Sequence, residues 1–168
     1  MNLTAKSRYA LKIMMDLALN EGEGQQQRQK IAQRQGISVD FMDHILARLR
    51  EHNLIQSTRG RTGGFRLKRK PETISLWDIF SSVEESLYPV RCMDDSGCEF
   101  EENCISLDAW SEVYRDIRLS LSAKNLHDIC ERWKSRESMI KDRQLSETAL
   151  SKECKGPSRQ LLQKSELK

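Results

Sequence analysis

Apolar residues near the start of the chain recur every three or four positions, which is the spacing of one face of an α-helix. The pattern predicts three amphipathic helices. The first begins after Thr4 as its N-cap, the second covers residues 29–35 and is ended by Gly36 in the left-handed conformation, and the third covers residues 38–52 with Ser38 as its N-cap. The positions that these helices would bury are Ala10, Ile13, Met14, Leu17, Ala18, Ile31, Ala32, Phe41, Met42, Ile45, Leu46 and Leu49.

The next segment changes from helical spacing to short β-strands. Residues 54–58 and 65–67 flank a glycine-rich, basic tip, and together they predict a β-hairpin. Two short helices joined by a glycine-containing turn and followed by such a hairpin are typical of a winged helix-turn-helix, whose second helix enters the major groove of DNA. A helical hairpin inside an unrelated core is the alternative, and the basic wing argues against it. We therefore predict a mostly α fold with a small β-hairpin.

Charge is distributed unevenly along the chain. Lysine and arginine number 28 against 25 aspartate and glutamate residues, but residues 1–70 hold fourteen of the former and six of the latter. A surface that neutralises DNA phosphates needs such a basic surplus. The residues that we expect to contact DNA are Ser38, Asp43, Arg48 and Arg50 on the third helix and Arg59, Gly60 and Arg61 on the wing. Asp43 is either a base reader, since a carboxylate accepts a hydrogen bond from cytosine, or a simple exposed residue.

Three equally spaced cysteines follow in an acidic stretch. A capping box at Ser75 and Asp78 predicts the start of a further helix. Beyond that helix, Cys92, Cys98 and Cys104 follow the spacing C-x5-C-x5-C. Thiolates suit zinc and iron–sulfur clusters. Zinc sites more often use a C-x2-C pair, so the spacing points away from a standard zinc site, and ordinary free thiols are the plain alternative.

Length, cysteine count and missing motifs narrow the class of protein. The 168 residues suffice for one domain, or for a small domain with appended elements. Five cysteines are an odd number, which argues for metal or redox chemistry rather than a disulfide framework, and no signal-peptide or membrane-spanning run is expected, so we predict a cytoplasmic protein. Three scattered histidines and no phosphate-binding glycine loop predict that the protein is not an enzyme.

A series of short motifs runs in order over about residues 1–134. They are Leu3-Thr4-x-Lys6-x-Arg8-Tyr9-Ala10, Asp16-x-Ala18-Leu19-Asn20, Arg34-Gln35-Gly36-Ile37-Ser38, Arg48-Leu49-Arg50, Arg59-Gly60 with Gly63-Gly64, Arg91-Cys92, Cys98, Cys104 and Trp110. In these motifs the chain resembles the Rrf2 family of transcriptional regulators, most closely its IscR-type branch of iron–sulfur cluster regulators. The resemblance implies a homodimer that binds a pseudo-palindromic operator in double-stranded DNA.

The resemblance and the composition together predict three parts. Residues 1–72 would be the winged DNA-binding domain, residues 73–134 the cluster-binding loop and dimerisation helix, and residues 135–168 a flexible tail, since they are polar and hold few apolar side chains. The long dimerisation helix is expected over about residues 106–130. Its apolar surface would consist of Trp110, Val113, Tyr114, Ile117, Leu119, Leu121 and Leu126.

The resemblance also implies that the three cysteines Cys92, Cys98 and Cys104 ligate an iron–sulfur cluster, 2Fe-2S in the IscR-type branch, whose status selects the operators that are bound. One position departs from that pattern. The histidine expected three residues after the last cysteine is Leu107 here, and leucine cannot ligate iron. Asp108 is the nearest oxygen donor to take its place. Other oxygen donors close by are Glu101 and Glu102.

The predicted function is therefore a transcriptional regulator that senses cluster status, redox stress or nitric oxide. Genes for cluster assembly would be among its targets, and the protein would act on them as a repressor or an activator. Cluster-assembly scaffold proteins would be further partners. One alternative is a zinc- or thiol-based winged-helix regulator or interaction module without a cluster. Another is a cluster carrier whose basic half docks an acidic partner, against which the wing argues.

Overall fold

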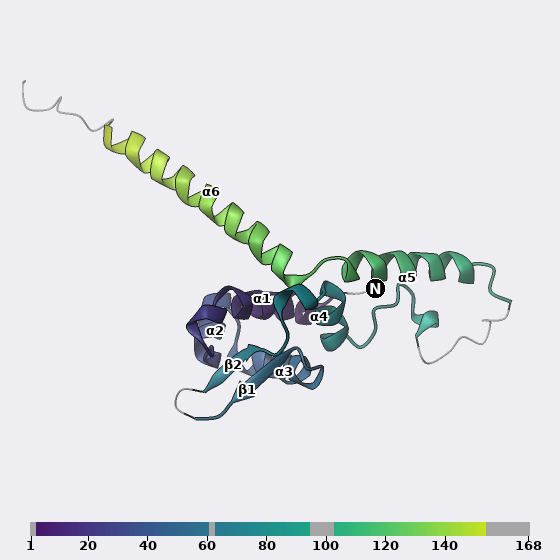
Figure 1. Ribbon diagram of the computed structural model, residues 1–168. Coiled ribbons are helices and arrows are strands. Elements are labelled where there is room, and N and C mark those ends of the chain that lie inside the picture. Colours follow the sequence, from purple (N-terminus) through teal and green to yellow (C-terminus); the bar gives the residue numbers. More distant parts are fainter. Residues whose placement is uncertain (1–2, 61–62, 95–102, 154–168) are drawn as a thin grey trace, which may run out of the picture. The chain divides into compact units, whose positions relative to one another are not determined.

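The computed structural model describes residues 3–60, 63–94 and 103–153, with side chains given through residue 143. The chain divides into two compact units, residues 1–130 and 131–168. Figure 1 labels the helices and strands. In order they are α1 (Ala5–Leu19), α2 (Arg28–Gln35), α3 (Val39–Glu51), β1 (Ile55–Thr58), β2 (Gly64–Leu67), α4 (Leu76–Val83), α5 (Leu107–Ser122) and α6 (Leu126–Glu153), with short 3-10 turns at Glu21–Glu23, Pro71–Thr73 and Arg91–Met93.

The first helix begins where its sequence predicts. Thr4 is the N-cap of α1, and its hydroxyl accepts a hydrogen bond from the backbone N–H of Lys6 at 3.0 Å. The helix packs against α3, α4 and β2. Its buried apolar side chains, which form the centre of the core, are Ala10, Ile13, Met14 and Leu17. The predicted inward face of this helix is thus confirmed at these positions.

The helix-turn-helix is also present as predicted, with one difference at its second N-cap. Gly36 ends α2 in the left-handed region, at φ 63° and ψ 44°. Ser38 occupies the N-cap position of α3, but its side chain makes no capping hydrogen bond. On α3 the side chain of Phe41 is only half-buried, and its ring packs edge-to-face with Tyr9 with the centroids 5.7 Å apart. The fully buried side chains of α3 are Met42, Ile45, Leu46 and Leu49.

The wing is a two-stranded antiparallel hairpin beside α3 (Figure 1). Its register pairs Ile55 with Leu67 and Thr58 with Gly64. Burial falls along β1, since Ile55 lies in the core, Gln56 is half-buried, and Ser57 and Thr58 are exposed toward the wing tip. The mostly helical fold with a small hairpin is therefore confirmed.

The expected long helix over residues 106–130 is wrong, because the chain breaks between α5 and α6. At the break, Lys124 O accepts from the backbone N–H of Leu76, and Leu126 donates its own N–H to Ile74 O, both at 2.8 Å. Asn125 then caps α6, since its Oδ1 accepts from the N–H of Asp128 at 2.8 Å. Leu126 is consequently buried in the core rather than on an apolar surface for a partner.

The segment from residue 135, predicted as a tail, takes helical backbone through Glu153 as part of α6. Ion pairs one helical turn apart support it, including Lys134 with Glu131 and Lys141 with Glu137. The boundaries of the three predicted parts stay a prediction. None of the helices in the described stretches of chain has the length and apolar character that a bilayer crossing requires.

Candidate DNA interface and cysteine segment

A surface hollow lies between the N-terminal end of α2, the helix α3 and the wing. Its lining includes Arg28 and Gln29 from α2, Asp43 from α3, and Arg59 and Gly60 from the wing tip. Three of the residues predicted to contact DNA are thus brought together by elements that are separate in sequence. Such a hollow exposes hydrogen-bonding and charged groups from both the recognition helix and the wing on one face.

The predicted base reader is held by a residue that the sequence analysis did not single out. Arg28 Nη1 donates to Asp43 Oδ2 at 2.7 Å, and both side chains are nearly half exposed. The neighbouring guanidinium offsets the repulsion that a bare carboxylate would meet close to phosphate. Arg28 is the first residue of α2, and its positive charge at the start of a helix is the feature of the sequence that could have marked it as a contact residue.

The two arginines of α3 do not line this hollow. Arg48 lines a different hollow, together with Lys6, Phe41 and His44. Its guanidinium pairs with Glu51 at 3.1 Å, a solvent-exposed contact of small energetic value. Arg50 is exposed in the last turn of the helix, and Ser38 is exposed at its start. Neither of these two arginines therefore lines the hollow of Asp43 and Arg59.

The wing tip is a tight turn that depends on its glycines. Arg59 is exposed, and Gly60 has φ 115°, a conformation that side-chain-bearing residues rarely adopt. Gly63 closes the tip by donating its N–H to Gly60 O at 3.0 Å, and a Cβ on Gly63 would lie 2.2 Å from the carbonyl oxygen of Thr58. Arg61 falls outside the described residues.

The cysteine segment, which runs from Cys92 to Cys104, is described at its two ends. Cys92 is exposed in the 3-10 turn Arg91–Met93, and Cys104 is half-buried just before α5. Neither forms a disulfide. Cys104 Sγ lies 3.5 Å from Ser106 Oγ, and this hydrogen bond, helped by backbone N–H groups, holds the pKa of the Cys104 thiol below its ordinary value. A lowered pKa favours the thiolate, which is the form that binds metals.

Cys92 and Cys104 offer the sulfur ligands that a thiolate-bound metal ion or iron–sulfur cluster requires. Among the residues with a described position, no three His, Cys, Asp or Glu side chains gather into a metal-holding group. Cys98, Glu101 and Glu102 lie outside these residues. Asp108 is exposed in the first turn of α5, and Leu107 is half-buried at the first position of that helix.

The stretch of chain between α4 and the 3-10 turn of Cys92 is fixed to the core by contacts that the sequence did not reveal. At its start, the Glu84 carboxylate accepts from the hydroxyls of Thr4 at 2.9 Å and Ser7 at 2.5 Å. Further on, the rings of Tyr88 and Tyr114 have centroids 4.5 Å apart, and Tyr114 meets Trp77 edge-on at 5.9 Å. The stretch that leads to Cys92 therefore contacts the start of α1 through Glu84 and contacts α5 through Tyr88.

Known proteins share this architecture and about a third of the aligned sequence. A model of the Rrf2 family, described as an iron-dependent transcriptional regulator, matches residues 3–132. The HTH-type transcriptional regulator IscR of Sodalis glossinidius is 35% identical over 126 residues, which are 75% of each chain. The solved structure of T. potens IscR superposes with a TM-score of 0.63 and 30% identity, covering 79% of this chain and 88% of that one. The structure of CymR, the global cysteine regulator of B. subtilis, gives a TM-score of 0.64 and 28% identity, with 79% and 98% covered.

Proposed function

Because the chain belongs to the Rrf2 family of transcriptional regulators and is related to IscR, we propose that it binds operator DNA through its winged helix and responds to an iron–sulfur cluster held by its cysteine segment. The proposed role is regulatory and involves no catalysis. In this role the protein acts on DNA in the cytoplasm. The target genes include those for cluster assembly, and scaffold proteins that assemble clusters are further partners.

The observation that carries the DNA-binding part is the shared hollow of α2, α3 and the wing. Arg28, Asp43 and Arg59 meet there, although they come from three separate elements. In this proposal Asp43 accepts from a base edge in the major groove, and Arg59 contacts a phosphate or the narrow minor groove. Ser38, Arg48, Arg50, Gly60 and Arg61 complete the proposed contact set.

A homodimer would place two such surfaces on one operator. The face of α5 that remains open in this subunit includes Trp110 and Val113, which are 37% and 41% exposed, and Leu119 is exposed as well. Apolar side chains on an exposed helix gain stability when a second copy covers them. The two recognition helices would then enter successive major grooves about 34 Å apart, which matches a pseudo-palindromic operator.

The cluster would be held by the thiolates of Cys92, Cys98 and Cys104, with 2Fe-2S as the proposed type. In support, the described thiols are free of disulfides, and the pKa of Cys104 is lowered by its hydrogen bond to Ser106. Such a cluster supplies redox chemistry and reactivity toward oxygen or nitric oxide. Asp108 is the proposed fourth donor, since Leu107 offers none.

A second candidate is a thiol-based regulator without a cluster. The likeness to Staphylococcus aureus CymR, one solved structure of which is of an oxidized form, favours it. In this version Cys92 and Cys104 would respond through their own oxidation, which their exposure and the lowered pKa of Cys104 permit.

Visible absorption, with iron and sulfide analysis of protein purified without oxygen, separates the two candidates. A brown protein that contains sulfide and loses its colour in Cys92→Ala and Cys104→Ala, but not in the control Cys154→Ala, supports the cluster. A colourless protein that carries zinc or no metal refutes the cluster and leaves the thiol-based regulator.

A further inference from the structure

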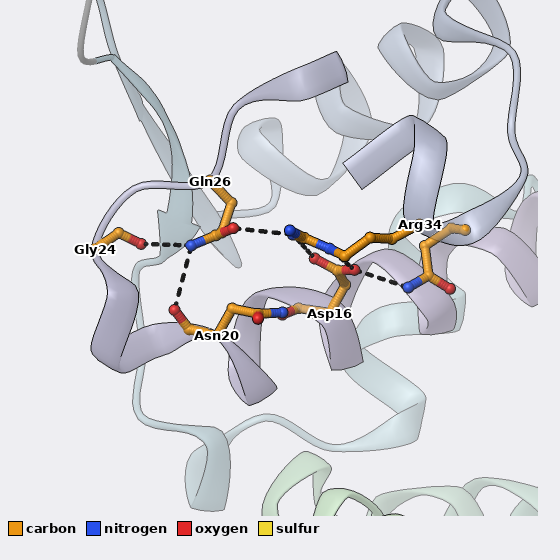
Figure 2. A network of polar contacts seen from close by, with 6 residues as sticks. Asp16, Asn20, Gly24, Gln26 and Arg34 are labelled. Carbon is orange, nitrogen blue, oxygen red and sulfur yellow. Dashed lines mark hydrogen bonds and ion pairs between the residues drawn. The ribbon is translucent and has the colours of Figure 1, made fainter. Parts of the chain in front are cut away.

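A buried polar network joins α1 to the helix-turn-helix (Figure 2). Asp16, near the end of α1, is only 3% exposed. Its carboxylate accepts from Arg34 Nε at 2.9 Å and Nη2 at 2.5 Å, and from Gln35 Nε2 at 2.7 Å. A buried carboxylate is costly unless it is paired and hydrogen-bonded. These bonds therefore fix α2, which carries both donors, against α1.

Arg34 extends the network to the loop before α2. Its Nη2 also donates to Gln26 Oε1 at 2.9 Å, and Gln26 Nε2 donates to the carbonyl oxygens of Gly24 at 3.3 Å and Asn20 at 3.4 Å. Figure 2 shows this side-chain amide lying between the guanidinium and the two carbonyls. Gln26 is 4% exposed and uses both ends of its amide, so its conformation is fixed.

The backbone of Gln26 is one of the points at which the wing attaches to the rest of the domain. Gln26 and Phe65 exchange two backbone hydrogen bonds of 2.9 Å, which form an isolated antiparallel bridge at β2. The contact depends on Gly64, because a Cβ there would lie 2.5 Å from the carbonyl oxygen of Gln26. Next to it, Gln25 Nε2 donates to Thr58 Oγ1 of β1 at 2.8 Å. The loop therefore contacts both strands of the hairpin.

We infer that Gln26 and Arg34 are positioning residues for the wing, because the network that they form with Asp16 holds Arg59 in place relative to α3 for simultaneous contact with DNA. Gln26 is buried, so its role is exerted through Phe65 and the hairpin rather than by direct contact with DNA. A wing that is already in place avoids the cost of ordering it on binding. This inference rests on the DNA binding proposed above.

A double-mutant cycle on operator affinity tests the inference with the full chain. Gln26→Met removes the three side-chain hydrogen bonds but keeps the length of the side chain and its backbone N–H and C=O. We expect it to weaken binding about tenfold, and we expect Arg59→Ala to cost at least about threefold less in that background than in the wild type. The matched control is Gln33→Met, at an exposed position of α2, which should leave the Arg59→Ala penalty unchanged.

Independent, additive effects of Gln26→Met and Arg59→Ala would overturn the inference and leave the DNA-binding proposal intact, as would unchanged affinity in Gln26→Met. If circular dichroism shows that Gln26→Met is unfolded, Arg34→Lys takes its place. A lysine keeps a charge beside Asp16 but lacks the planar fork that bonds two partners at once, so the same non-additivity is expected, and additivity refutes the inference. Wild-type protein that binds no DNA would refute the proposed function itself.

Discussion

Glu84 Oε1 accepts a 2.5 Å hydrogen bond from the hydroxyl of Ser7, so the residue that ends α4 holds the first turn of α1. The backbone N–H of Ser7 points at the same oxygen from 3.3 Å. Helix starts leave such N–H groups without intrahelical partners and carry a partial positive charge, so a carboxylate there is stabilising. The chain that leads to the cysteine segment therefore begins at a residue that is anchored on α1. The same helix carries Tyr9, which contacts Phe41 of α3.

Replacing this carboxylate should destabilise the fold. In Glu84→Gln, an amide accepts more weakly than a carboxylate and turns N–H groups toward the donors of Thr4 and Ser7, so we expect a loss of about 1–3 kcal/mol in the free energy of unfolding. Urea unfolding at neutral pH measures it. The control is Glu85→Gln, whose side chain is 94% exposed and should change the stability by less than about 0.5 kcal/mol. Equal losses in the two variants would contradict the assignment.

The same contact predicts a pH dependence. Burial favours the neutral acid, but hydrogen bonds from Ser7 and Thr4 outweigh it, so the pKa of Glu84 lies below its ordinary value. A carboxyl group with a lowered folded-state pKa stabilises the fold above the unfolded-state pKa, and this contribution is lost as the pH falls through the folded-state pKa. The stability gap between wild type and Glu84→Gln should therefore shrink as the pH falls from neutral to below about 4. A gap that stays constant over this range argues against a charged Glu84.

The wing arginine should contribute to DNA affinity through phosphate. Arg59→Ala should weaken operator binding and reduce the slope of log affinity against log salt by about one, the change expected for the loss of one phosphate contact. Fluorescence anisotropy at several salt concentrations measures both. Lys141→Ala on α6 removes a comparable exposed charge and serves as the control. Unchanged affinity in Arg59→Ala would exclude this role.

The absence of a histidine at position 107 should make the proposed cluster labile. Leu107→His supplies a nitrogen ligand at the position where the family pattern has one, so loss of visible colour in air should slow several-fold. Asp108→Asn should speed the loss if its carboxylate is the present ligand, whereas Glu112→Gln, one turn further along α5, should not change it. No slowing in Leu107→His would refute the idea that the fourth position is weakly ligated.

The open side of α5 should hold the dimer together. Val113→Glu places a charge on this apolar surface and should raise the dimer dissociation constant at least about tenfold, because burying an unpaired charge is costly. Analytical ultracentrifugation of the full chain measures it. Ser111→Glu adds the same charge at an exposed position of the same helix and should leave the association unchanged. An unaffected dimer in Val113→Glu would place the interface elsewhere.

Local signals in the sequence predicted the winged helix well, since the cap at Thr4, the left-handed Gly36 and the capping box of Ser75 with Asp78 act within a few residues. The break between α5 and α6 was missed because it depends on backbone bonds to residues 74–76, far away along the chain. The local sequence signal for this break was Asn125, whose side chain caps the start of α6.

The candidate site was predictable only in part for the same reason. Glycines and arginines at the wing tip marked Arg59 and Gly60 by composition alone. The pairing of Arg28 with Asp43 and the bridge between Gln26 and Phe65 join segments that no sequence spacing connects. Only the folded chain brings these groups together.

Selection of duplex DNA from a random-sequence pool by the full chain, purified without oxygen, tests the central claim most directly. The account predicts enrichment of a pseudo-palindrome whose half-sites lie about one helical turn apart, and loss of that enrichment in Arg59→Ala with Asp43→Ala. A pool that stays unenriched, with binding no tighter than to arbitrary sequence, would contradict the assignment of this winged helix as a sequence-specific DNA reader.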